Sequence, residues 1–515
     1  MKTYKYSLGS TLCGMCLLPL LTACGGTETG GTPEQKTVIS AEVRPLNPIV
    51  PEGVYIADPE VRQMPDGRIY VYGSKDEPGT AWCSPRYNVL SSSDLVNWDM
   101  EQISFATQGM GKQTAYSEEI LYAPDCIHHD GRYYLYYCLT DDSEGVAVAD
   151  SPYGPFKNGK KIEGIQGIDP SVFIDDDGQA YLFWGQWHAR GAKLNKEMNA
   201  IEGEIHDSLL TYDKHCFNEG SSVRKRNGIY YFVYGSHSQH GESNCATLDY
   251  ATATSPFGPY TYRGVIIDNW GSGRNLVNNH GCITEINGQW YIAYHRPTHA
   301  SSSMRKACLE PITFNEDGTI QQVEMTTQGA GGPMSPALRM EAYRACLLSG
   351  NVYPTVRRPE NDVPVEYLTG IRDGDCAYWK YYDFDQAEVN RFICKTWDKN
   401  LSAQIEIRLD NPDGELLGTC PLKPNNGETA YAIHETAIKT PKGKHALVLV
   451  FKGDRGGDPG QDLMNLEWFT FTINLTLTEQ NESNTDFRKP GGFAAVLRLW
   501  RWNSSAGTGQ TVRTG

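Results

Sequence analysis

Three acidic side chains occupy equivalent places in a repeated pattern of this sequence. Asp58, Asp169 and Glu219 each stand eight residues before an Asp-Gly or Asn-Gly pair. Folding alone gives no reason to gather carboxylates, because like charges repel one another and are costly to remove from water. Crowded carboxylates can, however, have their pKa values pushed apart, as a proton donor and a proton acceptor in one site require. The pattern therefore predicts acid–base chemistry by these three residues.

The repeat that spaces these acids is a turn followed by an apolar strand. Its five copies are DGRIYVYGS from Asp66, DGRYYLYYC from Asp130, DGQAYLFWG from Asp177, NGIYYFVYG from Asn227 and NGQWYIAYH from Asn287. An Asp-Gly or Asn-Gly pair before a strand rich in Tyr, Phe and Val is the strongest short-range signal for a β-hairpin. The turns recur at intervals of roughly 47 to 64 residues, which is typical of β-propeller blades. Five copies predict five blades, whose inner strands bring equivalent positions to one mouth of a central channel.

The region after the repeats has a different pattern. At 329–337 the composition changes to Gly and Pro, which predicts a linker. Residues 338–473 contain short alternating strands without helices, which predicts a β-sandwich of the jelly-roll type. We thus expect an all-β chain, with a five-bladed β-propeller over 45–328 followed by the sandwich. The Thr-, Asn- and Ser-rich segment 474–515 fits neither pattern and is expected to be a disordered tail, or an aberrant reading of the gene's end.

The N-terminus has the features of a targeting segment. A short basic region precedes an apolar run that ends in Leu-Thr-Ala-Cys at Cys24, and small residues before a cleavage point are typical of a secretory signal. This ending resembles a bacterial lipobox, in which the cysteine becomes lipidated; the alternative is an ordinary secretory signal with a chance cysteine. We expect a lipoprotein signal peptide over 1–23 and a flexible tether over 24–44. The protein would then be exported and lipid-anchored to the bacterial envelope, in the periplasm or at the cell surface.

Charge and cysteine content restrict the partners. The net charge of −16 at pH 7 argues against nucleic acid, because binding phosphates requires a basic face. The 14 cysteines include Cys13, Cys16 and Cys24, which leaves eleven in the body of the chain. These eleven contain no CxxC pair and no Cys/His ligand spacing, so the sequence gives little support to a disulfide framework or a zinc site.

Residues 45–325 resemble glycoside hydrolase family 43 in the order and spacing of five motifs. The matching pieces are Ala57-Asp58-Pro59, Ala123-Pro124-Asp125, Gly167-Ile168-Asp169-Pro170-Ser171, Glu219-Gly220-Ser221 and Asn279-His280-Gly281. The resemblance implies a propeller enzyme that hydrolyses O-glycosyl bonds (EC 3.2.1.-) with inversion at the anomeric carbon. It also implies that no cofactor is required for the chemistry.

The same resemblance implies a role for each acid. Asp58 would be the general base that deprotonates the attacking water, and Glu219 would be the general acid that protonates the departing oxygen. Asp169 would raise the pKa of that acid and orient it. The two carboxyl groups of an inverting pair stand about 6.5–9.5 Å apart to admit the water, and acids on different blades can satisfy this spacing.

Further positions are interpreted through the resemblance as well. His280 is expected to help hold a structural Ca²⁺ ion through water; the alternative is a hydrogen-bonded core histidine. Arg296 resembles the family's arginine that reaches the active site, and a surface salt bridge is the alternative. Tyr122 and Trp187 are expected to bind the sugar ring. Trp184 fits the core of a blade better.

The sandwich region resembles a family 6 carbohydrate-binding module. The matching pieces are Gly370-Ile371-Arg372-Asp373-Gly374-Asp375, Ile405-Glu406-Ile407-Arg408-Leu409-Asp410 and Asn465-Leu466-Glu467-Trp468-Phe469. Where that family often has Gly-Gly-Trp, this chain has Gly427-Glu428-Thr429, so one aromatic platform for sugar stacking is missing. The module is expected either to bind sugar or to have a purely structural role.

Together these features predict an inverting exo-glycosidase that acts on plant-type polysaccharide or glycan side chains. The first expected activity is that of an α-L-arabinofuranosidase, and the alternatives are a β-D-xylosidase and a galactosidase or galactofuranosidase. A hypothesis from another class is a glycan-binding lipoprotein without catalysis, which the presence of all three acids disfavours. The expected partner is an oligo- or polysaccharide, with no nucleic acid, and with membrane contact through the lipid anchor only.

Overall fold

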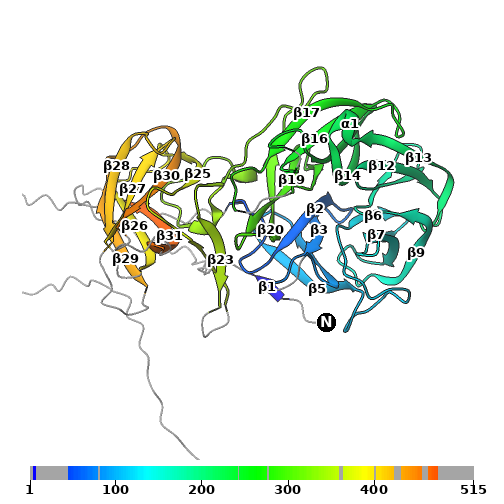
Figure 1. Ribbon diagram of the computed structural model, residues 1–515, viewed down its shortest axis with the longest axis horizontal. Helices are drawn as coiled ribbons and strands as arrows, with labels where there is room; N and C mark the ends of the chain where they lie inside the picture. Colours follow the sequence, from blue (N-terminus) through cyan, green and yellow to red (C-terminus); the bar gives the residue numbers. More distant parts are fainter. Residues whose placement is uncertain are drawn as a thin grey trace, which may run out of the picture. The chain divides into compact units, whose positions relative to one another are not determined.

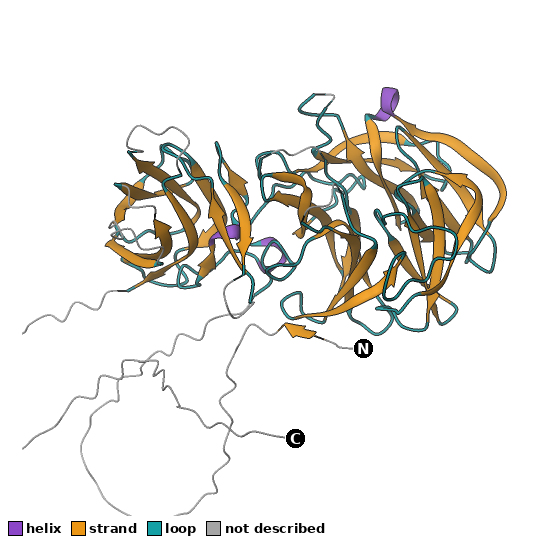
Figure 2. Ribbon diagram, turned by 60° about the horizontal axis from the view of Figure 1, so that its bottom comes forward, coloured by secondary structure: helices purple, strands orange, loops and turns teal. Residues whose placement is uncertain are grey.

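In the structure of the protein, a computed structural model, nearly all of the regular secondary structure of the described residues is β-strand (Figures 1 and 2). The structure describes residues 4–6, 44–78, 82–241, 243–274, 278–358, 363–398, 402–422, 431–454 and 462–473. Three short helical segments interrupt the strands in this part of the chain: α1 (Tyr212–His215), η1 (Gly329–Gly331) and η2 (Ala342–Arg344). The predicted signal peptide, tether and tail lie outside the described residues, apart from β1 (Tyr4–Tyr6) and Arg44 at the end of the tether.

The first part of the chain is the predicted five-bladed propeller. Blade one contains β2 (Ile56–Gln63), β3 (Ile69–Lys75), β4 (Arg86–Ser92) and β5 (Trp98–Ala106), with β1 paired to β5. Blade two contains β6 (Asp125–His129), β7 (Arg132–Cys138), β8 (Ser143–Ala149) and β9 (Lys157–Gln166). Blade three contains β10 (Ser171–Ile174), β11 (Ala180–Trp184), β12 (His188–Leu194) and β13 (Ile201–Thr211). Blade four contains β14 (Phe217–Arg226), β15 (Ile229–Ser236), β16 (Thr247–Ala253) and β17 (Thr261–Asp268), and blade five contains β18 (Cys282–Ile286), β19 (Gln289–Thr298) and β20 (Ser301–Pro311).

The turns that define the repeat form hairpins between the first two strands of each blade. In blades two, four and five the hairpin loop has two residues, because His129 pairs with Arg132, Arg226 with Ile229 and Ile286 with Gln289. Both residues of these loops have positive φ, which a type I′ turn requires and which Asp-Gly and Asn-Gly pairs adopt readily. The first and third blades have longer loops, in which only the glycine of the pair has positive φ.

The segment 47–49, which precedes blade one in the chain, completes the last blade. Its sheet has three strands, and the segment 47–49 runs beside β20. The backbone N–H of Ile49 donates to the carbonyl of Ala307, and the side chain of Asn47 accepts from the backbone N–H of Leu309. Covering this edge satisfies polar backbone groups that would otherwise be free to pair with another chain.

The second part of the chain is a β-sandwich, as predicted. One sheet has the order β23 (Tyr353–Arg357), β24 (Val365–Thr369), β31 (Met464–Thr472), β26 (Arg391–Asp398) and β29 (Ala432–Ala437), and β21 (Met340–Glu341) pairs with β31. The other sheet has the order β22 (Leu347–Leu348), β25 (Cys376–Asp383), β30 (Lys444–Gly453), β27 (Ala403–Leu409) and β28 (Leu416–Leu422). Trp379, Phe392 and Phe469 lie in the core between the sheets. The departure at Gly427-Glu428-Thr429 lies outside the described residues.

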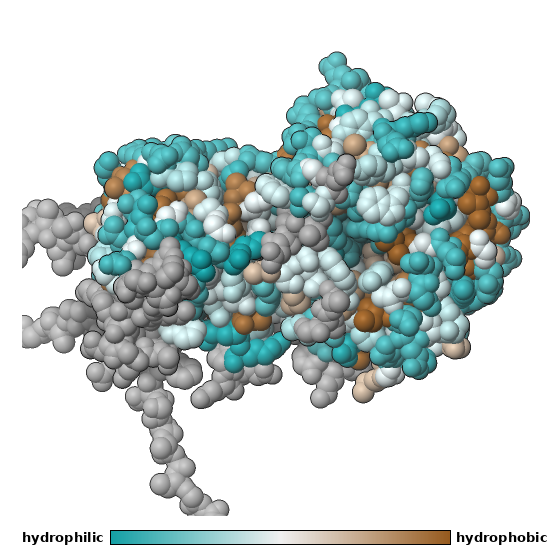
Figure 3. Space-filling model, in the orientation of Figure 1, coloured by the Kyte–Doolittle hydropathy of each residue, from teal (hydrophilic) through white to brown (hydrophobic). Residues whose placement is uncertain are grey.

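The surface is mainly polar. Hydrophilic residues cover most of the visible face in Figure 3, and hydrophobic residues occur in small separate groups. No helix in the described part of the chain is long and apolar enough to cross a membrane. Eleven cysteines follow Cys24, and ten of them are buried, consistent with small core residues.

Candidate active site

One mouth of the propeller channel forms a pocket of about 270 Å³ to which all five blades contribute. It is lined by Asp58, Trp82, Cys83, Tyr122, Ala123, Ile168, Asp169, Gln186, Glu219, Asn278, His280 and Arg305. The structure therefore brings together five residues that the sequence repeat and the motifs singled out, namely Asp58, Tyr122, Asp169, Glu219 and His280. They come from separate blades and meet because equivalent inner-strand positions converge at the channel.

Local irregularities in the inner strands turn the three acids into this pocket. Asp58 has φ 51° and lies at a register shift between Ala57 and Glu60 in β2. Asp169 has φ 60° and stands two residues before β10 begins. Glu219 lies between two register shifts in β14. Such bulges re-aim side chains and are common beside functional sites, and positive φ is uncommon for a residue other than glycine.

Asp58 is held as a carboxylate. It is only 6% exposed, and its Oδ1 accepts a hydrogen bond of 2.8 Å from Nη1 of Arg305, while Oδ2 accepts one of 2.6 Å from the Ser74 hydroxyl. Burial by itself raises the pKa of Asp58, but several effects, of which the positive charge of Arg305 is the largest, outweigh it and lower the pKa to about 2. His295 accepts the backbone N–H of Asp58 at 3.2 Å, and burial lowers the pKa of this histidine to about 3, so it is neutral.

Asp169 has the opposite electrostatic environment. It is buried, and its Oδ2 accepts the backbone N–H of Gly220 at 3.0 Å, directly after Glu219. Burial, followed by the negative charges of Glu219 and Asp58, raises the pKa of Asp169 well above its usual value. The two buried aspartates therefore differ, because Asp58 ionises easily, whereas ionisation of Asp169 is disfavoured and is coupled to that of Glu219.

Glu219 is more accessible than the two aspartates and has a partner from the neighbouring blade. Its Oε2 accepts a hydrogen bond of 2.7 Å from Nε2 of Gln186, which follows β11 in blade three. Gly220 next to it has φ 78°, and a Cβ atom there would lie 3.1 Å from the ring of His280. The glycine thus allows the imidazole to lie directly against the strand that carries the glutamate.

His280 lies between the two aspartates. Its Nδ1 is 3.7 Å from Oδ1 of Asp58 and 3.7 Å from Oδ2 of Asp169, and the side chain is almost fully buried. In the described part of the chain, no group of three or more His, Cys, Asp or Glu side chains is arranged to hold a metal ion directly. The imidazole therefore stands between the two carboxyl groups in the channel.

The channel wall below these acids carries oxygen atoms without protein partners. Glu60, Ser171 and Ser221 each stand two residues after one of the three acids, and one side-chain oxygen of each is buried without a hydrogen-bond partner. Buried polar groups normally have partners. These oxygen atoms stand on the inner strands of blades one, three and four, and such groups fit ordered water, or a cation held through its water ligands.

The prediction for Arg296 is corrected by the structure. Its guanidinium group is buried, donates to the hydroxyl of Tyr294 at 2.6 Å and the carbonyl of Thr326 at 2.6 Å, and lies 3.6 Å from Glu310. It does not line the pocket. Adjacent residues of β19 point to opposite faces of the blade. The motif around Arg296 therefore did not show whether this side chain faces the channel or the blade interior.

Arg305 occupies the place that was predicted for Arg296. It is 2% exposed, binds Asp76 through Nε and Nη2 at 3.0 Å each, and reaches Asp58 with Nη1. Its guanidinium carbon lies 5.0 Å from the ring centre of Trp82. Sequence reasoning missed this residue, although a charged Arg-Lys pair within the buried strand β20 was a signal that could have identified it.

The two tryptophans of blade three have different places. Trp184 is buried in the blade core, as expected, and donates to the carbonyl of Gln166 at 3.2 Å. Trp187 is 46% exposed and lies outside the pocket lining, but its backbone N–H donates to Asn218, the neighbour of Glu219, at 2.7 Å. Its ring stacks on His237 with 5.7 Å between centroids and 7° between planes. Trp187 thus presents an exposed aromatic ring beside the strand that carries Glu219.

Two family descriptions match the chain. Glycosyl hydrolases family 43 matches residues 45–320, and the carbohydrate binding module of family 6 matches residues 357–473. The chain is 30% identical over 524 residues to an arabinoxylan arabinofuranohydrolase of Bacillus subtilis (strain 168), covering 89% of this chain and 99% of that protein. It is also 30% identical to a xylosidase/arabinosidase of Thermoclostridium stercorarium, covering 79% and 96%. A crystal structure of a family 43 arabinoxylan arabinofuranohydrolase from Bacillus subtilis, in complex with cellotetraose, aligns with a TM-score of 0.48 at 27% identity, covering 83% of this chain and 97% of that one.

Proposed function

The chain belongs to glycosyl hydrolases family 43, and we propose that this glycoside hydrolase removes terminal α-L-arabinofuranosyl units from a plant-type polysaccharide with inversion. The observation that carries the mechanism is the pairing of Asp58 on blade one with Glu219 on blade four in one pocket. Blades one and four are not neighbours in the ring of five, so the channel mouth separates the two carboxyl groups. A water molecule and a sugar can then stand between them, as inversion requires.

Asp58 is the general base in this proposal. A base must be ionised before it can accept a proton, and the pKa of about 2 keeps Asp58 in the carboxylate form throughout the neutral range. Arg305 and Ser74 hold its two oxygens in place. The positive charge of Arg305 also makes the carboxylate a weaker base, so orientation of the water has to contribute to the rate as well.

Glu219 is the general acid, and Asp169 assists it. The backbone N–H of Gly220 binds Asp169, and burial together with the negative charge of Glu219 raises the pKa of Asp169, so the two carboxyl groups act as a coupled pair. The proton shared by this pair passes through Glu219, the more accessible member, to the departing glycosidic oxygen. Gln186 fixes the direction of the glutamate by its hydrogen bond to Oε2.

The size of the pocket favours removal of single terminal units. Its volume of about 270 Å³ lies below the range of about 300–1,000 Å³ that is usual for drug-sized ligands, and buried side chains such as His280 close it toward the channel. Such a pocket accepts one sugar ring, with the rest of the substrate at the rim. Tyr122 lines the pocket and Trp187 stands at the rim, where their rings can pack against sugar faces.

A second candidate activity is that of a β-D-xylosidase. A relative that is 30% identical over 471 residues is named for both xylosidase and arabinosidase activity, and a terminal pentose of either kind fits a pocket of this size. The two activities differ in the sugar that is released and in its anomeric configuration.

The test is a screen of monosaccharides released from a panel of polysaccharides and aryl glycosides, followed by proton NMR of the first product. We expect free arabinose from arabinoxylan, with inverted anomeric configuration in the first minutes. Release of xylose alone would favour the second candidate, and a product with retained configuration would contradict the role given to Asp58. A protein that binds the polysaccharide without releasing any sugar would support the non-catalytic hypothesis instead.

We also propose that a Ca²⁺ ion lies below the sugar site, held through water by His280. The partnerless oxygens of Glu60, Ser171 and Ser221 fit a hydrated cation better than direct coordination. When bound, the ion would supply positive charge beneath the carboxyl groups. Thermal unfolding with and without chelator tests this, because an ion that binds only the folded state raises the melting temperature.

For the rest of the chain we propose that Cys24 anchors the protein to the bacterial envelope by a lipid. The polysaccharide is the proposed partner of both the propeller and the family 6 module. The test is to express residues 338–473 separately and measure their retention on an insoluble polysaccharide. Retention would show that the module binds sugar. A folded module that is not retained would favour a structural role.

A further inference from the structure

A second cavity, of about 450 Å³, opens at the other end of the inner strands. We call it the distal pocket; its lining includes Arg62, Gln63, His128, Arg224 and Glu285. These residues belong to the final parts of β2, β6, β14 and β18, whereas the acids stand at or before the starts of the inner strands. Because a strand rises about 3.3 Å per residue, the five residues from Asp58 to Gln63 separate the two cavities by roughly 15 Å.

Two ion pairs occupy the channel above the distal pocket and make it a separate site. Arg62 binds both oxygens of Asp125, at 2.9 and 2.7 Å, and the carbonyl of Val172 at 2.9 Å. Arg224 binds Oε2 of Glu60 at 2.5 Å. Since all four charged side chains are largely buried, a ligand of the distal pocket does not enter the catalytic mouth.

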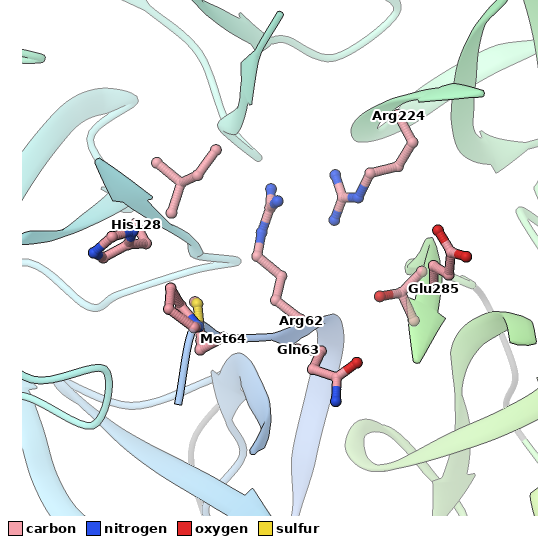
Figure 4. A pocket seen from close by; sticks show the side chains of 9 residues that line it. Arg62, Gln63, Met64, His128, Arg224 and Glu285 are labelled. Atoms are coloured by element: carbon pink, nitrogen blue, oxygen red, sulfur yellow. The ribbon is translucent and has the colours of Figure 1, made fainter. Parts of the chain in front are cut away.

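Each of the two arginines has one N–H nitrogen that can donate a hydrogen bond to a ligand in the cavity. Among the described residues, Nη1 of Arg62 and Nε of Arg224 have no hydrogen-bond acceptor, and neither nitrogen is among the buried partnerless atoms. Figure 4 shows the two guanidinium groups reaching toward the middle of the cavity from different blades. The side chains of His128 and Glu285 stand on opposite sides of them.

The charges of the pocket favour a neutral ligand over an anion. Arg62 and Arg224 are each neutralised by a carboxylate, and the exposed Glu285 adds a negative charge. An anion would therefore meet no excess of positive charge, whereas hydroxyl groups can accept from the arginines and donate to the glutamate. Charge-assisted hydrogen bonds of this kind are stronger than those between neutral groups.

Part of the lining is apolar, so the pocket can also contact the C–H groups of a ligand. Met64, Pro65 and Ile127 contribute carbon surface beside the polar groups. A sugar ring presents C–H groups on its faces and hydroxyl groups on its edge, so it can pack on this surface and bond to the arginines and Glu285 together. The volume of about 450 Å³ is in the usual range for ligand pockets.

We propose that the distal pocket binds a neutral sugar unit of a polysaccharide, independently of the catalytic mouth. The choice of a polysaccharide as the source of that sugar rests on the proposed function. A second sugar site on the opposite face of the propeller would keep the enzyme on a polymer between cleavage events, because linked binding events raise the effective concentration. It would have no influence on a small aryl glycoside.

The experiment uses the full chain with Glu219→Gln, labelled with ¹³C at the methionine methyl groups. Met64 lines the distal pocket and is one of 11 methionines, so the change Met64→Leu assigns its signal. We expect xylotriose to shift the Met64 methyl signal saturably, while the Met198 signal in the core of blade three stays in place. The double change His128→Ala/Glu285→Ala should weaken the binding measured at Met64 about tenfold, the loss expected for removing a charge-assisted hydrogen bond and its neighbour.

Two controls keep the outcome decisive. Glu204→Ala removes an exposed carboxylate from β13 outside the pocket and should leave the titration unchanged, and His128→Gln/Glu285→Gln replaces the alanine pair if that variant unfolds. A Met64 signal that does not respond to xylotriose, or that responds equally in the pocket variants, would overturn the proposal. A stronger response to inorganic phosphate or glucuronate would overturn the choice of a neutral ligand.

This outcome is separable from failure of the proposed function. With Glu219 intact, His128→Ala/Glu285→Ala should hydrolyse aryl glycosides at the parental rate and release sugar from the polymer more slowly at low polymer concentration. If the parent enzyme released no sugar while Met64 still responded to xylotriose, the proposed function would fail and the distal site would stand.

Discussion

Nη1 of Arg305 donates a hydrogen bond of 2.8 Å to Oδ1 of Asp58, although the two residues are 247 positions apart in the chain. The same guanidinium group binds both oxygens of Asp76, so it is fixed before any substrate enters. The last strand of the propeller thereby orients a carboxylate on the first. This contact connects closure of the blade ring with the state of the proposed base.

The acidic limb of the pH–rate profile should depend on Arg305. Burial raises the pKa of Asp58 and Arg305 lowers it to about 2, so Arg305→Met should move the acidic limb of kcat/KM to higher pH by about 1–3 units. The variant should also lose stability, by about 3–5 kcal/mol, because Asp76 is left buried without its partner. Arg305→Lys keeps the charge and should shift the limb less. An acidic limb at the parental position in a folded Arg305→Met enzyme would contradict this electrostatic role.

Neutralising either proposed proton-transfer group should stop turnover without unfolding the protein. We expect Asp58→Asn and Glu219→Gln each to lower kcat about 10²–10⁴-fold, the usual contribution of a general acid or base. For Glu219→Gln the loss should be smaller on aryl glycosides with good leaving groups, which need little protonation. Rates on a series of leaving groups and circular dichroism of each variant provide the measurement. Equal losses across the series would exclude Glu219 as the acid.

Asp169 should control the alkaline limb. Burial and the charge of Glu219 raise the pKa of Asp169, so this pair of carboxyl groups retains a proton more strongly than separate groups would. Asp169→Asn removes the mutual repulsion and should move the alkaline limb to lower pH, by about one unit or more. The limb reports the pair of carboxyl groups and not one residue alone. Asparagine can still accept the hydrogen bond from the backbone of Gly220, which preserves the local geometry. If Asp169→Asn had normal activity and an alkaline limb at the parental pH, Asp169 would have only a structural role.

Trp187 should matter for polymers and not for small substrates. Its exposed ring lies at the rim next to the strand that carries Glu219 and stacks on His237. Trp187→Ala should raise KM for a polysaccharide about tenfold, since the loss of one aromatic contact costs about 0.5–1.5 kcal/mol beyond its buried area. The KM for an aryl arabinofuranoside should stay the same. Tyr153→Ala, which removes another exposed ring away from the pocket lining, serves as the control.

Cys24 should determine attachment to the membrane. Stable anchoring needs more than one acyl chain, and in the proposed lipoprotein the cysteine carries the lipid, so Cys24→Ser should abolish labelling by a fatty-acid analogue. The variant should then be found in the soluble fraction or as the uncleaved precursor. Label that persists in Cys24→Ser would refute the lipid anchor, and Cys16→Ser within the same segment is the matched control.

The sequence by itself determined the blade repeat and the convergence of its acids. A turn signal depends on neighbouring residues, so Asp-Gly and Asn-Gly pairs can be recognised locally, and five regular copies fix the number of blades. Counting back from each turn then placed Asp58, Asp169 and Glu219 at one mouth, where the structure has them. The alternating strands of the sandwich were recognisable for the same reason.

Only the tertiary structure decided which more distant side chains complete the site. Arg296 and Arg305 both lie in strands of blade five, and the sequence offered no means to tell which one faces the channel, because bulges and register shifts change the direction of a side chain. The pKa values were equally beyond the sequence, since they depend on burial and on charges from other blades. Arg305 lowers the pKa of Asp58 and Glu219 raises that of Asp169, and both effects exist only when closure of the ring brings these residues together.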